Sequence, residues 1–333
     1  MAIDEIGKTL TEIDRVLAVA PQEPQPLWNR AMAIHQLELP RTAAAAFDEV
    51  AALGDPALSA EARALAKALR GACAAREREW QLADAAGKAM MDATPPPLSS
   101  LRAFPGLMRH YLYWAVRAAE TREQLLPLLP AARELDSIEG RGLLTALVEA
   151  TAASDLRAGA PRARARRELQ LGWGPPAASE EERREGWRQK TLVLQTGADE
   201  LRALIAARRD PWHVALLALS DARSSGADAE GILSRAIDEC KPAQVDYQCA
   251  QMQYQLARVH LKLAAADAAR APARAAAAQA LAIDGLARGR AAGVDGRMEV
   301  LLLFTIAEAA QLGHADALGR AYRQESELRN DEL

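Results

Sequence analysis

Apolar residues recur at spacings of three and four along most of this 333-residue chain, and polar or charged residues fill the positions between them. That spacing places apolar side chains on one face of a helix, whereas the runs of β-branched residues typical of strands are nearly absent. The pattern therefore predicts an all-α protein. The predicted helices cover residues 3–19, two between 26 and 56, then 59–70, 75–92, 106–119, an interrupted helix at 123–135, 143–153, 162–171, a helix from 179, 198–208, 211–224, 227–239, 243–265, 272–292, 296–312 and 315–329.

The clearest helical hairpin lies between Pro26 and Pro56. Its two amphipathic helices flank a proline-marked turn, and their spacing resembles a tetratricopeptide (TPR) repeat, with Ala31 at the eighth position, Ala43 at the twentieth and Phe47 at the twenty-fourth. Small residues at the first two of these positions let the helix backbones approach closely, and the phenylalanine fills the gap to the next hairpin. Another kind of alanine-rich αα-hairpin would share part of this spacing, so both interpretations stay open at this point.

Two proline-rich stretches, TPPPLSS at 94–100 and GWGPP at 172–176, are typical of connectors because they cannot continue a helix. They predict TPR-like hairpins in 1–93, divergent hairpins with Pro/Gly-rich connectors in 94–176, and C-terminal TPR-like hairpins in 177–333. The predicted fold class is an all-α, right-handed α-solenoid of TPR-like hairpins, whose ends should fray before its middle. The helix at 3–19 resembles the second helix of a hairpin, so we expect the chain to begin inside a longer array.

Composition and charge narrow the class of function. Aromatic residues make up only 4% of the chain and its formal net charge is −4, whereas a nucleic-acid-binding domain is expected to be basic. The N-terminal stretch carries acidic residues throughout, unlike a secretory signal, and no run approaches the roughly 20 apolar residues of a membrane span. We therefore expect a cytoplasmic protein that binds neither nucleic acid nor membrane.

The residues that could carry chemistry are scattered. Cys73, Cys240 and Cys249 lack the spacing of a zinc site or a disulfide framework, so we expect three reduced thiols, with a Cys240–Cys249 contact as the alternative. No phosphate-binding glycine loop, nucleophile elbow or dinucleotide motif is present. We expect no catalysis, no cofactor and no metal, although a serine, histidine and aspartate brought together by folding stay open. The histidines show no ligand-type pair and are His35, His110, His213, His260 and His314.

Four segments in order carry a resemblance to a known family: NRAMAI, LRAFPGLMRHYLYWAVRAAETREQLLPLLPAARELD, CKPAQVDYQCAQMQYQLARVHLKL and ALGRAYRQESELR. They resemble the helical TPR region that precedes the caspase-like CHAT protease domain in large bacterial proteins. The resemblance implies a region that senses or docks a partner and controls a cysteine protease. Protease activity itself is not implied, because no strand-borne histidine and cysteine follow in this chain.

The face expected to bind a partner is the exposed side of the first helix of each hairpin, which lines the concave surface of a superhelix. In the hairpin between 26 and 56 the residues at these positions are Trp28, Asn29, Met32, His35 and Gln36. By resemblance to TPR grooves, Asn29 would hold a peptide backbone or carboxylate. Alternatively, Trp28 and Met32 pack against a preceding hairpin.

Two further groups of residues are candidate binding surfaces. Tyr111, Tyr113 and Trp114 form an aromatic cluster that we expect in the core rather than in a binding site. The basic surface residues are Arg162, Arg164, Arg166 and Arg167. The acidic residues of EEERRE follow closely, so we expect a solvated face with ion pairs rather than a site for an acidic partner or nucleic acid.

Taken together, the sequence predicts a non-catalytic scaffold that binds a protein or peptide partner, such as a protease or another signalling component, in a bacterial signalling or defence complex. The alternative is the regulatory region of a CHAT protease whose catalytic domain lies outside this chain. An autonomous hydrolase on a helical fold is the least supported interpretation, since no local motif points to an activated nucleophile.

Overall fold

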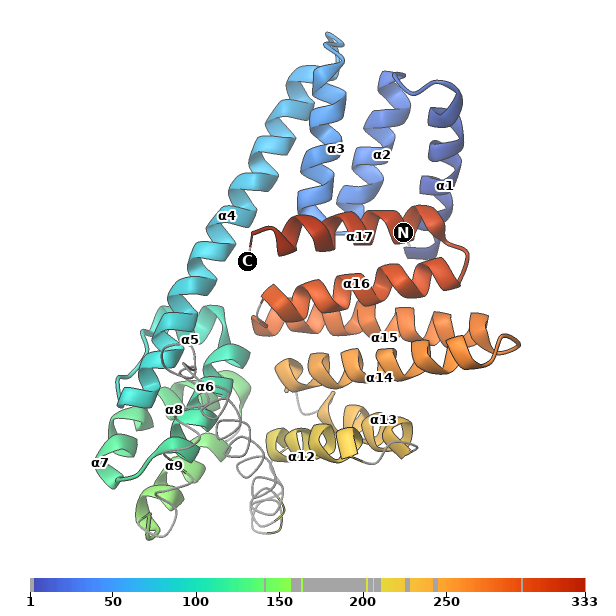
Figure 1. Cartoon of the computed structure of the whole chain (residues 1–333). Helices are drawn as coiled ribbons and strands as arrows, with labels where there is room; N and C mark the ends of the chain where they lie inside the picture. The colour runs from blue at the N-terminus through green and yellow to red at the C-terminus, as the bar shows by residue number, and fades with distance from the viewer. Residues whose placement is uncertain are drawn as a thin grey trace, which may run out of the picture. The chain divides into compact units, whose positions relative to one another are not determined.

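The computed structural model describes residues 3–140, 142–156, 163, 202, 206, 211–224, 228–241, 245–294 and 296–332. Within these residues the structure contains helices and no strand, so the all-α class is confirmed there (Figure 1). The α-helices are α1 (Ile3–Val19), α2 (Pro24–Gln36), α3 (Pro40–Ala52), α4 (Ser59–Ala89), α5 (Leu98–Ala103), α6 (Pro105–Ala118), α7 (Arg122–Leu125), α8 (Leu129–Glu139), α9 (Leu143–Ala153), α12 (Pro211–Ser224), α13 (Ala229–Cys240), α14 (Asp246–Ala266), α15 (Ala271–Ala292), α16 (Gly296–Leu312) and α17 (Asp316–Asn330). Two 3-10 helices, η1 (Met90–Asp92) and η2 (Leu126–Leu128), follow α4 and α7.

Most of the helices begin and end within a few residues of the predicted positions. There are two exceptions: α5 was not predicted and begins within the stretch 94–100 expected to be a connector, and α4 is a single helix where two were predicted at 59–70 and 75–92. The predicted break was wrong because one glycine, Gly71, costs a helix only about 1 kcal/mol and alanines on both sides favour its continuation. The helices predicted at 162–171, from 179 and at 198–208 lie outside the described residues.

Two compact units make up the chain, and each is assembled from segments that are distant in sequence. Unit 1 comprises Met1–Arg78, Gln253–Arg290 and Asp295–Leu333, and unit 2 comprises Glu79–Met252 and Ala291–Val294. The division into three consecutive segments at the proline-rich stretches stays a prediction.

Unit 1 is built on close helix crossings. Ala31 of α2 and Ala43 of α3, predicted as the close-contact pair, are both fully buried, and Phe47 is buried beside them. The two helices form the predicted hairpin between 26 and 56 (Figure 1). Small side chains at the crossing explain why two short helices without side-chain caps pack stably, because most of the stability of such helices comes from tertiary contact.

The first and the last helix of the chain are in contact within unit 1. Arg320 of α17 forms an ion pair with Asp14 of α1 at 2.6 Å. Glu325 of α17 accepts a hydrogen bond from the backbone N–H of Thr42, in the first turn of α3, at 2.7 Å. No local sequence pattern predicts these two contacts, because the paired residues lie far apart in the sequence. The predicted right-handed solenoid of TPR-like hairpins stays a prediction.

Unit 2 has an aromatic core. Tyr111 and Tyr113 of α6 are buried and Trp114 is half-buried, so the expectation that this cluster belongs to the core is confirmed for the two tyrosines. Trp212 of α12 stacks on Tyr113 with ring centroids 5.0 Å apart. Tyr247 of α14 stacks in turn on Trp212 at 6.0 Å. Helices from distant parts of the sequence therefore meet at one group of rings.

The expectation of three free thiols is wrong for two of the cysteines. Cys240, the last residue of α13, and Cys249, in the first turn of α14, are joined by a disulfide, with their Cα atoms 6.0 Å apart. Both are buried. The Cys240–Cys249 contact that the sequence left as the alternative is therefore present. Cys73 is a free thiol.

Candidate functional site

The five residues predicted to bind a partner, here called the α2 face, lie on α2 in unit 1 and are Trp28, Asn29, Met32, His35 and Gln36. Asn29, His35 and Gln36 are exposed. Trp28 and Met32 are half-buried against the core of the unit, and the Trp28 ring meets Phe47 edge-on at a centroid distance of 5.5 Å. The structure therefore splits the α2 face into an exposed polar part and an apolar part that also supports packing.

The side chain of Asn29 is engaged within its own helix. Its Oδ1 accepts a hydrogen bond from Nε2 of Gln25 at 3.0 Å. Both residues are exposed, so this bond can exchange with water or with a ligand at little cost.

The last hairpin, α16–α17, repeats the register of α2–α3. Ala307 and Gly319 are separated by the same number of residues as Ala31 and Ala43. A Cβ atom added to Gly319 would lie 3.1 Å from the carbonyl oxygen of Ala307, so the two backbones approach closely at this pair of positions. Small residues therefore occupy the crossing in both hairpins, for the same packing reason.

The contact between large side chains repeats as well. In the first hairpin, Trp28 packs on Phe47. At the same two positions of the last hairpin, the guanidinium of Arg323 lies over the ring of Phe304, 5.3 Å from its centroid. An aromatic pair in one hairpin is thus replaced by a cation–π pair in the other, and both are common contacts at such distances.

The register shows which side of α16 corresponds to the α2 face. Its matching residues are Phe304, Thr305, Glu308, Gln311 and Leu312. Thr305 is buried, and the other four are exposed or half-exposed. Leu301, one turn before Phe304, continues the surface, and Leu301, Phe304 and Leu312 keep 40%, 41% and 39% of their areas exposed. Three large apolar side chains on one helix face are therefore partly exposed to solvent.

A stripe of α14 adjoins this side of α16. Arg258, which follows the buried Ala257, forms an ion pair with Glu308, which follows the buried Ala307. This ion pair joins the two helices. Tyr254 and Lys262 lie one turn before and one turn after Arg258 on the same stripe. We define the α14/α16 face as Tyr254, Arg258, Lys262, Leu301, Phe304, Glu308 and Leu312.

The α14/α16 face was missed from the sequence, although one signal could have found it. Ala307 and Gly319 are separated by the same number of residues as Ala31 and Ala43, so the residues of α16 that correspond to the α2 face can be identified by counting. The sequence could not have shown which residues of α16 are exposed to solvent, because the helix carries apolar residues on nearly every side. Only the packing shows that Leu302, Leu303 and Ile306 are buried while Leu301 and Phe304 are not.

A network of ion pairs in unit 1 is a second candidate for a functional site. Glu299 of α16 pairs with Arg290 at 2.9 Å and with Arg329 at 3.2 Å. Burial alone would raise the pKa of Glu299, but these two arginines hold the pKa of its carboxyl below its usual range. The remaining members of the network are Arg41, Glu77, Glu325 and Glu332. Every carboxylate in this group has a cationic partner, so the network joins helices rather than activating a reactant.

Cys73 lies near this network and is the free thiol of the chain. Burial raises the pKa of the Cys73 thiol, and the nearby Arg41 only partly opposes that effect. A thiol with a raised pKa is mostly protonated at neutral pH and is a poor nucleophile. The geometry therefore does not point to cysteine-based catalysis here.

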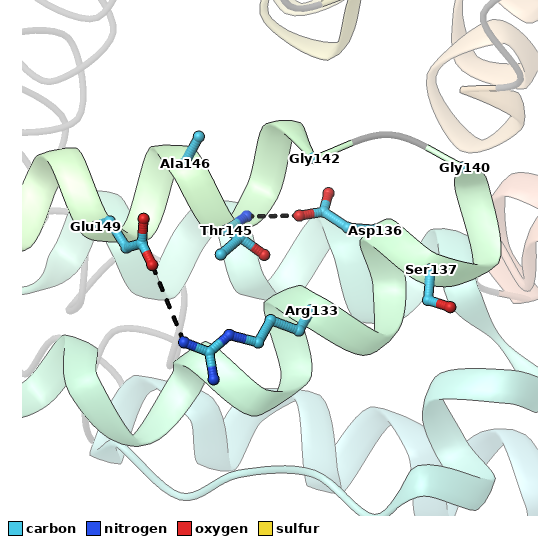
Figure 2. Close-up of a pocket in the computed structure, with 8 residues that line it drawn as sticks. All are labelled: Arg133, Asp136, Ser137, Gly140, Gly142, Thr145, Ala146 and Glu149. Carbon is cyan, nitrogen blue, oxygen red and sulfur yellow. Dashed lines mark hydrogen bonds and ion pairs between the residues drawn. The ribbon is translucent and has the colours of Figure 1, made fainter.

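An open pocket of about 540 Å³ lies at the turn between α8 and α9 in unit 2 (Figure 2). Asp136 accepts hydrogen bonds from the backbone N–H groups of Leu144 at 2.9 Å and Thr145 at 2.8 Å, and so caps α9. Figure 2 also shows Arg133 extending toward Glu149, 4.0 Å away. These polar groups stabilise the turn, and we assign the pocket no chemistry. Its lining residues are Arg133, Asp136, Ser137, Gly140, Gly142, Thr145, Ala146 and Glu149.

The histidines were expected to be scattered, but folding brings two of them to the same aromatic core. The ring of His213 meets Tyr113 edge-on at 4.8 Å, and the ring of His110 stacks on Tyr247 at 4.9 Å. Burial lowers the pKa of His110 to about 4. Among the residues that the structure describes, no group of histidine, cysteine, aspartate and glutamate is placed to hold a metal ion.

The predicted basic surface, Arg162, Arg164, Arg166 and Arg167, lies outside the described residues. Over the ranges that are described, no helix is both long and apolar enough to cross a membrane. A comparison of the chain with models of known protein families and with curated proteins found no match.

Proposed function

We propose that this chain is a non-catalytic, TPR-like scaffold that binds a protein or peptide partner through the α2 face and the α14/α16 face. The proposal includes the right-handed stacking of TPR-like hairpins predicted from the sequence. By resemblance to the regions that precede CHAT protease domains, the partner would be a protease or another component of a bacterial signalling or defence complex.

The observation that carries this proposal is the exposed apolar surface of α16. Leu301, Phe304 and Leu312 are partly exposed to solvent on a regular helix whose opposite side is fully packed. Large apolar side chains gathered on one face are typical of surfaces that a partner covers. Their position in the hairpin supports the proposal further, because it matches the α2 face that the sequence singled out.

The test compares capture of a partner by variants of the two faces. Asn29→Ala combined with His35→Ala alters the α2 face at exposed positions, and Phe304→Ala alters the α14/α16 face. Leu82→Ala is the matched control, because Leu82 is 70% exposed in unit 2. Each chain would be used to purify associated proteins from the cells that make it, and each enriched protein would then be titrated in purified form.

We expect a protein that binds the wild type and the Leu82→Ala control but binds at least one face variant about tenfold more weakly. Circular dichroism would check that the variants keep their helices. If every variant binds the same protein as tightly as the wild type does, these faces are not its binding surface and the proposal is wrong.

A further inference from the structure

Resting on the proposed function, we propose that the α14/α16 face binds an acidic amphipathic segment of a partner protein, in which carboxylates flank leucine or aromatic side chains. The α2 face offers exposed amides and a histidine, whereas the α14/α16 face combines apolar side chains with cations. This difference in chemistry is what identifies the class of segment.

The apolar part of the face is a stripe along α16. Leu301 and Phe304 lie one turn apart, and Leu312 lies two turns beyond Phe304, so all three share one side of the helix. Each is about two-fifths exposed. Tyr254 of α14 is half-buried and lies one turn before Arg258, which forms the ion pair with Glu308 of α16. This stripe suits leucine or aromatic side chains of a ligand.

The charged part of the face is mostly cationic. Arg323 lies over Phe304, Arg258 pairs with Glu308 of α16, and Lys262 follows Arg258 by one turn of α14. Glu308 is already paired with Arg258, so the surplus positive charge comes from Lys262 and from Arg323, whose guanidinium covers Phe304. Lys262 is exposed and makes no hydrogen bond or ion pair with the described residues. A ligand carboxylate would give these cations a partner of opposite charge.

A nucleic acid fits this arrangement less well. Phosphate binding favours a run of cations along the ligand backbone, whereas here apolar side chains occupy the middle of the face and the chain as a whole carries a charge of −4. An acidic segment satisfies both parts of the face at once. The same chemistry predicts that binding weakens as salt is added, because the cations at the rim are exposed to solvent.

The experiment selects peptides from a random-peptide phage library against the full chain and measures the affinity of the selected peptides by fluorescence anisotropy. The test variants are Lys262→Glu, which reverses an exposed charge on the face, and Phe304→Ala. Lys8→Glu is the matched control, since Lys8 is an exposed lysine of α1 in unit 1. Single-stranded RNA is titrated in parallel.

We expect selected peptides rich in Asp and Glu next to Leu, Phe or Trp, bound about tenfold more weakly by each test variant and unchanged by Lys8→Glu. Peptides without acidic residues, peptides that Lys262→Glu binds as well as the wild type does, recovery of no binding peptide, or binding of RNA in their place would each overturn the inference. Loss of peptide binding in the Asn29→Ala/His35→Ala variant alone would overturn it while leaving the proposed scaffold function standing.

Discussion

Replacing Gly319 by leucine tests whether α16 and α17 cross as closely as α2 and α3. Gly319 lies in α17 opposite Ala307, at the position that Ala43 occupies in the first hairpin. If the crossing is tight, a large side chain there must push the two helices apart. If the crossing is loose, leucine should stabilise the protein, because it is a far better helix former than glycine.

The structure sets the expected magnitude. An added Cβ alone would lie 3.1 Å from both the carbonyl oxygen of Ala307 and Cγ of Gln311. That is closer than the roughly 3.5–4.0 Å of favourable contact between nonbonded atoms, and leucine adds three more carbon atoms beyond it. Overpacking of this kind costs about 1–3 kcal/mol, against a gain in helix propensity of somewhat less than 1 kcal/mol. We expect a net loss of about 1–2 kcal/mol in the free energy of unfolding.

Urea denaturation followed by circular dichroism would measure this loss as a shift of the midpoint at unchanged slope. Gly71→Ala is the control, since no heavy atom lies within 4 Å of an added Cβ at this helical glycine, and it should stabilise the chain by about 1 kcal/mol. If Gly319→Leu is as stable as the wild type or more stable, the helices do not cross closely there. The shared register of the two hairpins would then be refuted.

Three further predictions concern buried residues that stabilise the two units. Glu325→Ala removes a fully buried carboxylate at the start of α3 and should destabilise the chain by about 3 kcal/mol in chemical denaturation, whereas alanine at the exposed Glu327 should change it by less than about 0.5 kcal/mol. Gly87→Ala would drive its Cβ into the buried ring of Tyr111 and should lower the melting temperature despite the better helix former, so an unchanged or higher value would contradict the packing. Because burial lowers the pKa of His110 from 6.5 to about 4, the unfolded state takes up the proton first, and about 3 kcal/mol of stability should be lost as the pH falls from 6.5 to 4. His110→Phe should lose correspondingly less over that interval, and equal losses in both proteins would mean that the ring is not shielded.

Local patterns were enough to predict most of the described helices and the first hairpin. The spacing of apolar residues depends on neighbours within one or two turns, and the pair Ala31 and Ala43 marks a crossing by size alone. The same reasoning failed between residues 70 and 75, where two helices were predicted although α4 is continuous.

Contacts between distant segments could not be predicted in this way. The ion pair of Asp14 with Arg320 joins residues from the two ends of the chain, and the sequence around either residue does not predict the other as its partner. The disulfide of Cys240 with Cys249 joins two helices, and their cysteines lack the spacing of a known disulfide framework. The exposed side of α16 needed the fold for a different reason: its sequence is apolar all round, so only the packing distinguishes Phe304 from its buried neighbours.

The most direct test of partner binding is site-specific photocrosslinking in the cells that make this protein. A benzoyl-phenylalanine side chain would replace Phe304 in one chain and the exposed Leu82 of unit 2 in another, and crosslinked proteins would be identified by mass spectrometry. We predict a discrete crosslinked protein from position 304 that is absent from position 82. The same products from both positions, or no product from position 304 in a folded chain, would contradict the account.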